Sequence, residues 1–361
     1  MYNTLNKQYI FKLSSGVIHN VYCNQKAELC ISSLKKPDSW TAPVKIAENV
    51  HESFSACIDD EDKITALFQD TDGSMFCSVV ENGSLRTIPV LKSRQKSLYE
   101  KHFHIIPVKN DLNVFFVLRH NDSFILSHQI MSGNNPPKAP RVVDYVTESI
   151  QPYTTVLDRL KNIFIFYRLP AGSNTQIGYK KYIPSKGVWG EFTPLTGYSG
   201  SCKFPSAAVD GKNIMHIRYQ RRPHRYYELV YQQKIADKNI WTNEMVVHSS
   251  VHPFENSSLL CINESIIIFW VREGIIYYSL SKDGGSSWKK PLKYDFYTGR
   301  QLMCMAYRTN ESYEKEKVYI NDIPGSYMKG VRLAFHPNIK AGIADATQNE
   351  LRNVVVDNLE V

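Results

Sequence analysis

The sequence predicts an all-β protein built from repeated four-stranded antiparallel units. Three observations lead to this prediction: a strand-like apolar run that recurs about every fifty residues, tryptophans that recur at a similar interval, and an aromatic content of 12% in a chain of 361 residues. Aromatic and β-branched side chains favour strands. A repeat of this length is typical of the blades of a β-propeller, which we therefore predict as the fold.

Each copy of the apolar run opens with a β-branched residue and is expected to form the second strand of its unit. The copies are residues 17–22, 64–68, 114–118, 163–167, 214–219, 266–270 and, more weakly, 318–320. In the second unit, the four strands are expected at 54–58, 64–68, 75–80 and 86–91. The segments between them are rich in Asp, Asn and Gly, which favour turns.

The length of the chain fits seven blades, which we favour, with six as the alternative. Segments 302–307, 318–320 and 331–335 supply three strands of a last unit. Residues 1–336 are expected to form one propeller domain, because single repeats cannot bury their faces alone. Residues 337–361 form a C-terminal tail, which we expect to supply a closing strand through 354–356 or a short helix through 344–351.

Four of the five tryptophans open a similar segment in their units. They are Trp40, Trp189, Trp241 and Trp288, each about 22 to 27 residues after the apolar run of its unit. This distance corresponds to the turn between the third and fourth strands. The tryptophans thus give a second marker of the same repeat.

The segment from Ser281 to Trp288 has the pattern S-x-D-x-G-x-x-W and follows a strand-like run. Asp283 is expected to accept hydrogen bonds from backbone N–H groups of a tight turn, and Gly284 and Gly285 permit a positive φ there. Trp288 is expected to fold back under the hairpin. The segment resembles the Asp box of sialidase-like (neuraminidase, BNR-repeat) β-propellers. The resemblance implies a structural role for Ser281, Asp283, Gly285 and Trp288, and the other units lack the full motif.

The resemblance also implies a ligand site, because an arginine trio holds the sugar carboxylate in sialidases. In a propeller the ends of the second strands lie on the face opposite the Asp-box turns, and several cations occur there. Arginine pairs well with carboxylates and phosphates, and aromatic side chains stack on sugars. The alternative is that these side chains only extend to water. The candidate ligand-binding residues are Arg119, His120, Arg168, Arg218, Arg222, Tyr226 and Arg272.

Catalytic residues are not identified by the sequence. Sialidase-like enzymes carry an early Phe-Arg-Ile-Pro-type segment, an acidic residue and a tyrosine nucleophile paired with Glu. Here Lys12 replaces the arginine of that segment and no proline follows. The remaining carboxylates, Asp70, Asp72, Glu228 and Glu273, form no spaced motif. We therefore predict a non-catalytic binding module for a glycan, an anionic ligand or a protein partner. The alternative is a sialidase-like glycoside hydrolase that holds an acidic sugar through Arg119, Arg168 and Arg272.

Composition limits the classes of partner that we expect for this chain. The formal charge of +8 is spread along the chain without a dense basic run, so we expect neither nucleic acid nor membrane as a partner. The pair His102 and His104 has a spacing that suits metal ligation but is insufficient alone, so no metal and no cofactor are expected. The seven cysteines form no C-x-x-C pair and are expected to be buried thiols. We expect a monomer. We also expect it in the cytoplasm, because no signal segment opens the sequence.

Overall fold

The computed structural model describes residues 7–336, except 37–38, 82, 95, 97–98, 134–136, 198, 236–239, 255, 263, 297–301, 316–319 and 328–329. Every regular element in this part of the chain is a β-strand, which confirms the all-β prediction. No helix in it is long and apolar enough to cross a membrane. The expected strand at 354–356 and the expected helix at 344–351 lie outside the described residues.

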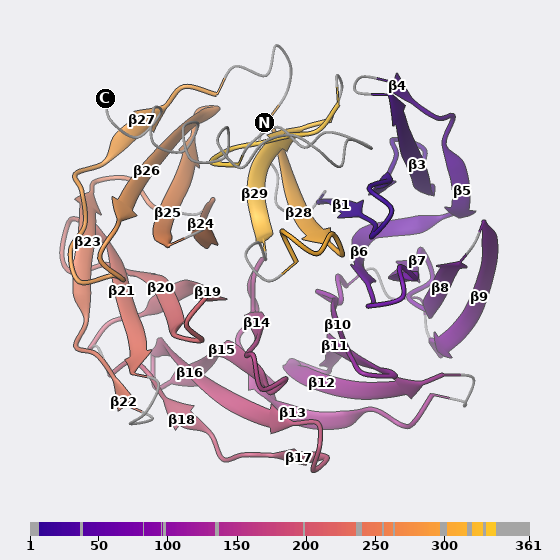
Figure 1. Cartoon of the computed structure of the whole chain (residues 1–361). Helices are drawn as coiled ribbons and strands as arrows, with labels where there is room; N and C mark the ends of the chain where they lie inside the picture. Colours follow the sequence, from indigo (N-terminus) through magenta and orange to yellow (C-terminus); the bar gives the residue numbers. More distant parts are fainter. Residues whose placement is uncertain are drawn as a thin grey trace.

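Five antiparallel sheets follow one another along the chain (Figure 1). The first contains β6 (Val50–Ile58), β7 (Ile64–Asp70), β8 (Met75–Glu81) and β9 (Ser84–Leu91), and the second contains β10 (His104–Val108), β11 (Asp111–His120), β12 (Ser123–Ser132) and β13 (Arg141–Val146). The third contains β14 (Tyr153–Leu157), β15 (Ile163–Ala171), β16 (Asn174–Ile183), β17 (Val188–Trp189) and β18 (Thr193–Pro194). The fourth contains β19 (Cys202–Val209), β20 (Met215–Arg221), β21 (Tyr227–Ile235), β22 (Ile240–Trp241) and β23 (Met245–Ser250), and the fifth β24 (Ser257–Ile262), β25 (Ser265–Arg272), β26 (Ile275–Ser281) and β27 (Leu292–Tyr294).

A sixth sheet of eight strands joins the two ends of the described chain. It contains β1 (Gln8–Lys12), β2 (Ile18–Cys23), β3 (Leu29–Lys36), β4 (Ser39–Trp40) and β5 (Val44–Ala47) together with β28 (Met303–Thr309), β29 (Ile320–Ser326) and β30 (Arg332–Leu333). The two groups meet where β1 pairs with β28 in parallel, with Gln8 opposite Met305. The first and last predicted units therefore share one sheet.

The six sheets surround a common centre, and β6, β10, β14, β19 and β24, the first strands of the five smaller sheets, lie nearest to it within their sheets (Figure 1). Along the chain, β6 contacts β10, β10 contacts β14, β14 contacts β19 and β19 contacts β24. The eight-stranded sheet continues this series, because β24 contacts β29 and β1 contacts β6. The side chains that begin these inner strands are consequently brought together from distant parts of the sequence.

The predicted apolar runs form the second strand of each set. In β15, for example, six consecutive residues from Ile163 to Arg168 are buried, because both faces of the strand are covered by neighbouring sheets. A short continuous apolar run of this kind is typical of a fully buried strand. Full burial of one side chain such as Phe166 contributes roughly 1.5–3 kcal/mol to folding. In the last set, the second strand is described from Ile320 to Ser326, and the predicted residues 318–319 lie outside the described part of the chain.

The tryptophans lie beside the third strands. Trp40, Trp189 and Trp241 each end a two-residue strand that pairs with the third strand of its sheet. Trp288 follows β26, and its ring contacts Tyr231 of the preceding sheet at a centroid distance of 4.9 Å. All seven cysteines fall within the described residues; they are buried and form no disulfide.

The turn from Ser281 to Trp288 is held by hydrogen bonds to Asp283. The backbone N–H of Ser287 donates to Asp283 Oδ1 at 2.9 Å, and the Ser281 hydroxyl donates to the same oxygen at 2.8 Å. The Ser287 hydroxyl, the backbone N–H of Ser287 and the Ser281 hydroxyl lower the pKa of Asp283 to about 2. Gly285 has a φ of 91°, and a Cβ there would lie 2.0 Å from the Tyr231 hydroxyl. The turn is thus fitted closely against the neighbouring sheet.

Candidate functional site

A cavity of about 90 Å³ lies among the innermost strands. Its walls come from β1 and β29 of the eight-stranded sheet, or residues just before them, and from the sheets that begin with β6, β10, β14 and β24. Most of the lining side chains are polar, and several are aromatic. Those with titratable groups are Lys7, Tyr9, Glu100, His102, His104 and Asp322, together with Tyr153.

An ion pair joins the two ends of the described chain in this cavity. Lys7 Nζ lies 2.6 Å from Asp322 Oδ1, and the two side chains are only 17% and 21% exposed. Burial alone lowers the pKa of Lys7, but the Asp322 carboxylate outweighs it, so the pKa of Lys7 is raised. Burial raises the pKa of Asp322, and the Lys7 ammonium more than reverses this effect. Both groups are therefore charged at neutral pH.

Two histidines in the cavity are uncharged at neutral pH. Burial, with a further contribution from the Lys7 ammonium, lowers the pKa of His104 to about 3. Burial lowers the pKa of His102 to about 4. His104 Nδ1 lies 2.9 Å from Thr155 Oγ1, and His102 Nδ1 lies 3.6 Å from Glu100 Oε1. A neutral imidazole offers one donor and one acceptor, so both rings can hydrogen-bond a polar ligand.

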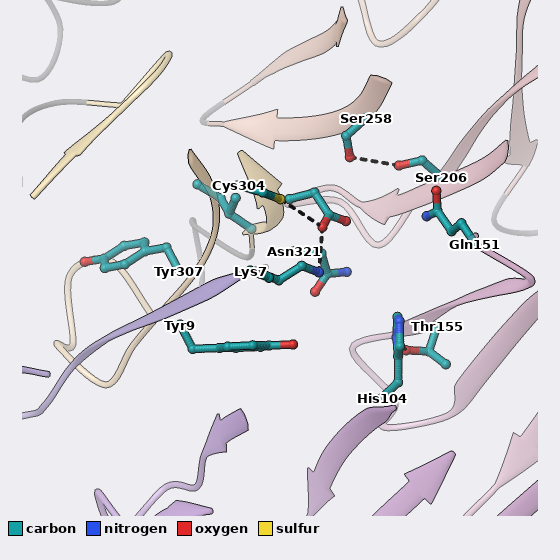
Figure 2. A network of polar contacts seen from close by, with 12 residues as sticks. Lys7, Tyr9, His104, Gln151, Thr155, Ser206, Ser258, Cys304, Tyr307 and Asn321 are labelled. Carbon is teal, nitrogen blue, oxygen red and sulfur yellow. Dashed lines mark hydrogen bonds and ion pairs between the residues drawn. The ribbon is translucent and has the colours of Figure 1, made fainter. Parts of the chain in front are cut away.

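Aromatic side chains complete the wall around the ion pair. Figure 2 shows Tyr9 and His104 directed toward the same space as Lys7. The Tyr9 hydroxyl donates to the carbonyl oxygen of Phe54 at 3.3 Å, and burial raises the pKa of this phenol although Lys7 opposes the shift. The Tyr153 hydroxyl donates to the carbonyl oxygen of His102. These contacts fix the orientation of both rings.

Small polar side chains of β24 also line the cavity. Among them, Ser258 Oγ lies 3.0 Å from the Oγ of Ser206, which is outside the lining and also accepts from the backbone N–H of Leu259 (Figure 2). Gln151 Nε2 donates to the carbonyl oxygen of Pro205 at 3.4 Å. Ile150 also lines the cavity and is 64% exposed, which gives the polar site one accessible apolar contact.

None of the seven candidate ligand-binding residues from the sequence lines this cavity. Three of the arginines are exposed, and each guanidinium lies over an aromatic ring of the third strand of its own sheet. The distances to the ring centroids are 6.0 Å for Arg119 over Phe124, 4.9 Å for Arg222 over Tyr227 and 5.5 Å for Arg272 over Tyr277. His120 and Tyr226 are also exposed.

The other two candidate arginines are buried. Arg218 is fully buried, and its Nη1 donates to the carbonyl oxygen of Phe204 at 2.9 Å. Its Nε and Nη2 have no hydrogen-bond partner among the described residues. Burial lowers its pKa to about 9. Arg168 is 6% exposed and donates from Nη2 to Thr175 Oγ1 at 3.3 Å. The arginines named for the hydrolase alternative therefore occupy different environments, and none of them reaches the cavity.

The loop carboxylates considered for catalysis hold local structure. Asp70 Oδ1 accepts from the backbone N–H groups of Asp72 and Ser74, and Glu228 Oε2 lies 2.7 Å from Arg221 Nε. These contacts belong to a turn and to a half-buried ion pair. His102 and His104 do not lie on one strand, because His102 has a φ of 51° and β10 begins only at His104. No group of three metal-ligating side chains occurs in the described ranges.

The residues of the cavity were mostly missed by the sequence analysis. Lys7, Glu100 and Gln151 precede first strands, and Asp322 lies in β29, so none belongs to the recurring apolar run. The one local signal was the spacing of His102 and His104. Polar residues just before the predicted first strands are a further signal of the site, because these positions meet at the centre.

Comparisons with known proteins agree with this fold. No family model matches the chain, and no curated protein does. Among solved structures, the BP39L lectin from Burkholderia pseudomallei is similar over 91% of this chain and 94% of its own, at 11% identity and a TM-score of 0.60. A polysaccharide lyase of family PL25, an ulvan lyase bound to -[GlcA(1-4)Rha3S]-, is similar over 94% of this chain and 93% of its own. The identity is 13% and the TM-score is 0.55.

A sialidase is also similar, but less so. The NanB structure matches 73% of this chain and 64% of its own at 10% identity, with a TM-score of 0.46. At such identities the lectin and lyase matches support an all-β, propeller-like fold and nothing finer. The finer resemblance of the Ser281–Trp288 turn to the Asp box stays a prediction.

Proposed function

We propose that this chain is a glycan-binding β-propeller of seven units, the first and last of which share one sheet, and that its central cavity receives a sugar residue. The observation that carries this proposal is the convergence of polar and aromatic side chains from five sheets on one cavity. Ligand sites in proteins combine apolar and aromatic walls with a few placed polar groups. The occurrence of a lectin and of a lyase with a bound oligosaccharide among proteins of similar fold supports a glycan as the ligand.

The chemistry of the cavity suits hydroxyl groups. The uncharged imidazoles of His102 and His104 and the amide of Gln151 offer both donors and acceptors, which a sugar ring can use from several directions. Tyr9 and Tyr153 supply aromatic surface, and Ile150 supplies an exposed apolar contact. The Lys7–Asp322 pair adds charged hydrogen-bonding groups, which bind hydroxyls more strongly than neutral ones.

The exposed arginines extend this proposal beyond the cavity. Arg119, Arg222 and Arg272 follow or end second strands, and each forms a flat surface with the ring beneath it. Such pairs attract acidic groups and stack on sugar faces. We propose that they contact further residues of a longer acidic polysaccharide. Nucleic acid and membrane are not proposed as partners.

The protonation states favour binding over catalysis. A general acid or base works best when its pKa lies near the working pH. In this cavity the pKa of His104 is lowered to about 3, that of His102 to about 4, and that of Tyr9 is raised by burial. None of the three groups exchanges a proton readily at neutral pH. The glycoside hydrolase alternative, which relies on Arg119, Arg168 and Arg272, receives no support from the surroundings of these side chains.

A polysaccharide lyase is the second candidate function. Lys7, Tyr9 and His104 line one cavity. An elimination next to a carboxylate needs a cation for the carboxylate and a base for the adjacent proton. The similarity to the ulvan lyase extends over 94% of this chain. This activity requires that bound substrate change the pKa of His104 or Tyr9 toward neutrality.

A glycan array tested together with lyase and glycosidase assays separates these functions. We expect binding to a set of oligosaccharides, with no unsaturated product and no hydrolysis. Glu100→Gln and Gln151→Ala should weaken binding by about tenfold, whereas Glu148→Gln, an exposed glutamate outside the cavity, should not. Release of an unsaturated uronate would establish the lyase instead. Silence in every assay would refute the proposal and direct attention to a protein partner.

A further inference from the structure

Tryptophan rings fill the space between neighbouring sheets at several junctions of this molecule. Trp189 packs edge-on against Phe115 and His128 of the preceding sheet, at centroid distances of 6.2 Å and 5.4 Å and interplanar angles of 83° and 88°. Trp241 and Trp288 also pack edge-on against the sheets that precede their own. The Nε1 atoms of these three tryptophans have no hydrogen-bond partner among the described residues, so their rings are held by packing rather than by hydrogen bonds.

The corresponding loop of the sheet that begins with β10 has no tryptophan. Residues 133–140, between β12 and β13, contain no aromatic residue. The preceding sheet begins with β6 and lies next to this one (Figure 1). A groove with a volume of about 770 Å³ lies between the two sheets, and it shares no lining residue with the central cavity. Its volume is in the range of sites that bind small molecules.

One wall of this groove corresponds to the surface against which Trp189 packs. Phe115 of β11 lies opposite His128 of β12. In the preceding sheet, Thr65 of β7 lies opposite Val79 of β8, and it has the place of Phe115 in its own copy of the apolar run. Thr65 and Val79 both line the groove. The space stays open because these side chains are smaller than Phe115 and His128 and because no tryptophan ring covers them.

The groove has an apolar base and a charged rim. The base includes the buried side chains of Cys57, Cys77 and Met131. Burial raises the pKa of Cys77 to about 12, so this thiol is uncharged at neutral pH. The thioether of methionine makes favourable contacts with aromatic rings. At the rim, Lys63 Nζ lies 3.6 Å from Glu81 Oε2, and the two side chains are 33% and 50% exposed.

We propose that this groove binds the aromatic ring of a small polar molecule. The ring, of indole size or somewhat larger, lies between β8 and β12, in the place that a tryptophan of the chain itself takes at other junctions. The apolar base contacts the ring, and the polar substituents of the ligand point to the charged rim and to water. The site is separate from the central cavity, so this inference does not depend on the glycan proposal.

Binding of 5-fluoroindole to the full chain, followed by fluorine NMR, tests the site. The wild-type protein should broaden and shift the ligand signal in a saturable way. Thr65→Phe places in the groove the side chain that Phe115 supplies at the next sheet, so it should abolish this binding. Thr87→Phe is the matched control, because Thr87 is an exposed threonine of the same sheet outside the groove lining, and it should keep wild-type affinity. Absence of saturable binding to the wild-type protein, or equal affinity of Thr65→Phe, would overturn the proposal.

Anomalous diffraction locates the ligand without any substitution. Crystals of the wild-type protein soaked in 5-bromoindole should show a bromine peak between β8 and β12, close to Val79 and Met131. Bromine peaks only at other places, or no peak, would contradict the proposal, whatever the glycan array shows.

Discussion

Two aspartates show how differently two regions of this molecule are built. Asp283 lies in an exposed turn and accepts hydrogen bonds from Ser281 and Ser287, within four residues of itself. Asp322 lies at the centre and pairs with Lys7, which is at the other end of the described chain. The pKa of each carboxyl is lowered. For Asp283 the cause is local hydrogen bonds, and for Asp322 it is the ammonium of Lys7, which is far away in the sequence and outweighs the effect of burial.

The difference matters for function. The Ser281–Trp288 turn can be recognised from its sequence because all of its hydrogen-bonding partners are local. The central cavity is assembled only when the sheets surround it, so its residues carry no motif. In this molecule the conspicuous sequence feature supports the scaffold, whereas the proposed ligand site is formed by residues that are unremarkable in the sequence.

The largest expected effect comes from removing the central carboxylate. Asp322→Asn leaves the Lys7 ammonium four-fifths buried without its counter-ion, which should lower the free energy of unfolding by roughly 3 kcal/mol. Urea denaturation measures this change. Asp72→Asn removes the partner of Lys96 in a pair whose side chains are 71% and 66% exposed, and it should cost less than about 0.5 kcal/mol. Similar losses from both substitutions would show that the central pair is not specially important.

A smaller loss is expected when the turn is forced away from the neighbouring sheet. Gly285→Ala places a Cβ 2.0 Å from the Tyr231 hydroxyl at a φ of 91°, so it should cost roughly 2 kcal/mol. Gly284→Ala is the matched control, because its φ of 70° is also positive but no atom lies within 4 Å of the added Cβ. Its cost should be near 1 kcal/mol. Equal costs in urea denaturation would argue against close packing of the turn on Tyr231.

The smallest expected effect is the pH dependence contributed by Asp283. Its folded pKa of about 2 lies below the ordinary value of 3.8, so the folded state favours the charged form. The resulting stabilisation is complete above 3.8 and is lost as the pH falls through about 2. The unfolding temperature of the wild-type protein should therefore approach that of Asp283→Asn as the pH falls through this range. A constant difference between the two proteins would contradict the proposed role of the carboxylate.

Much of the fold could be predicted from the sequence because it depends on local patterns. The apolar runs are second strands covered on both faces, and the aspartate- and glycine-rich segments are turns, so the expected strand at 64–68 corresponds to β7 (Ile64–Asp70). The parallel pairing of β1 with β28 could not be predicted in this way. It joins segments almost three hundred residues apart, and neither strand carries a local sign of its partner.

The candidate site could be predicted only in outline. The sequence placed cations at the ends of second strands, and Arg119 and Arg272 do lie there. It could not separate them from Arg168 and Arg218, because burial depends on the neighbouring sheet rather than on the strand itself. The ion pair of Lys7 with Asp322 was not foreseen for the same reason.

The most direct test of the central claim is the crystal structure of the protein with the oligosaccharide that binds most strongly in the array. We expect electron density for a sugar residue in the central cavity, in contact with His104, Gln151 and the Lys7–Asp322 pair. Density confined to the surface around Arg222 and Tyr226, with an empty cavity, would contradict it.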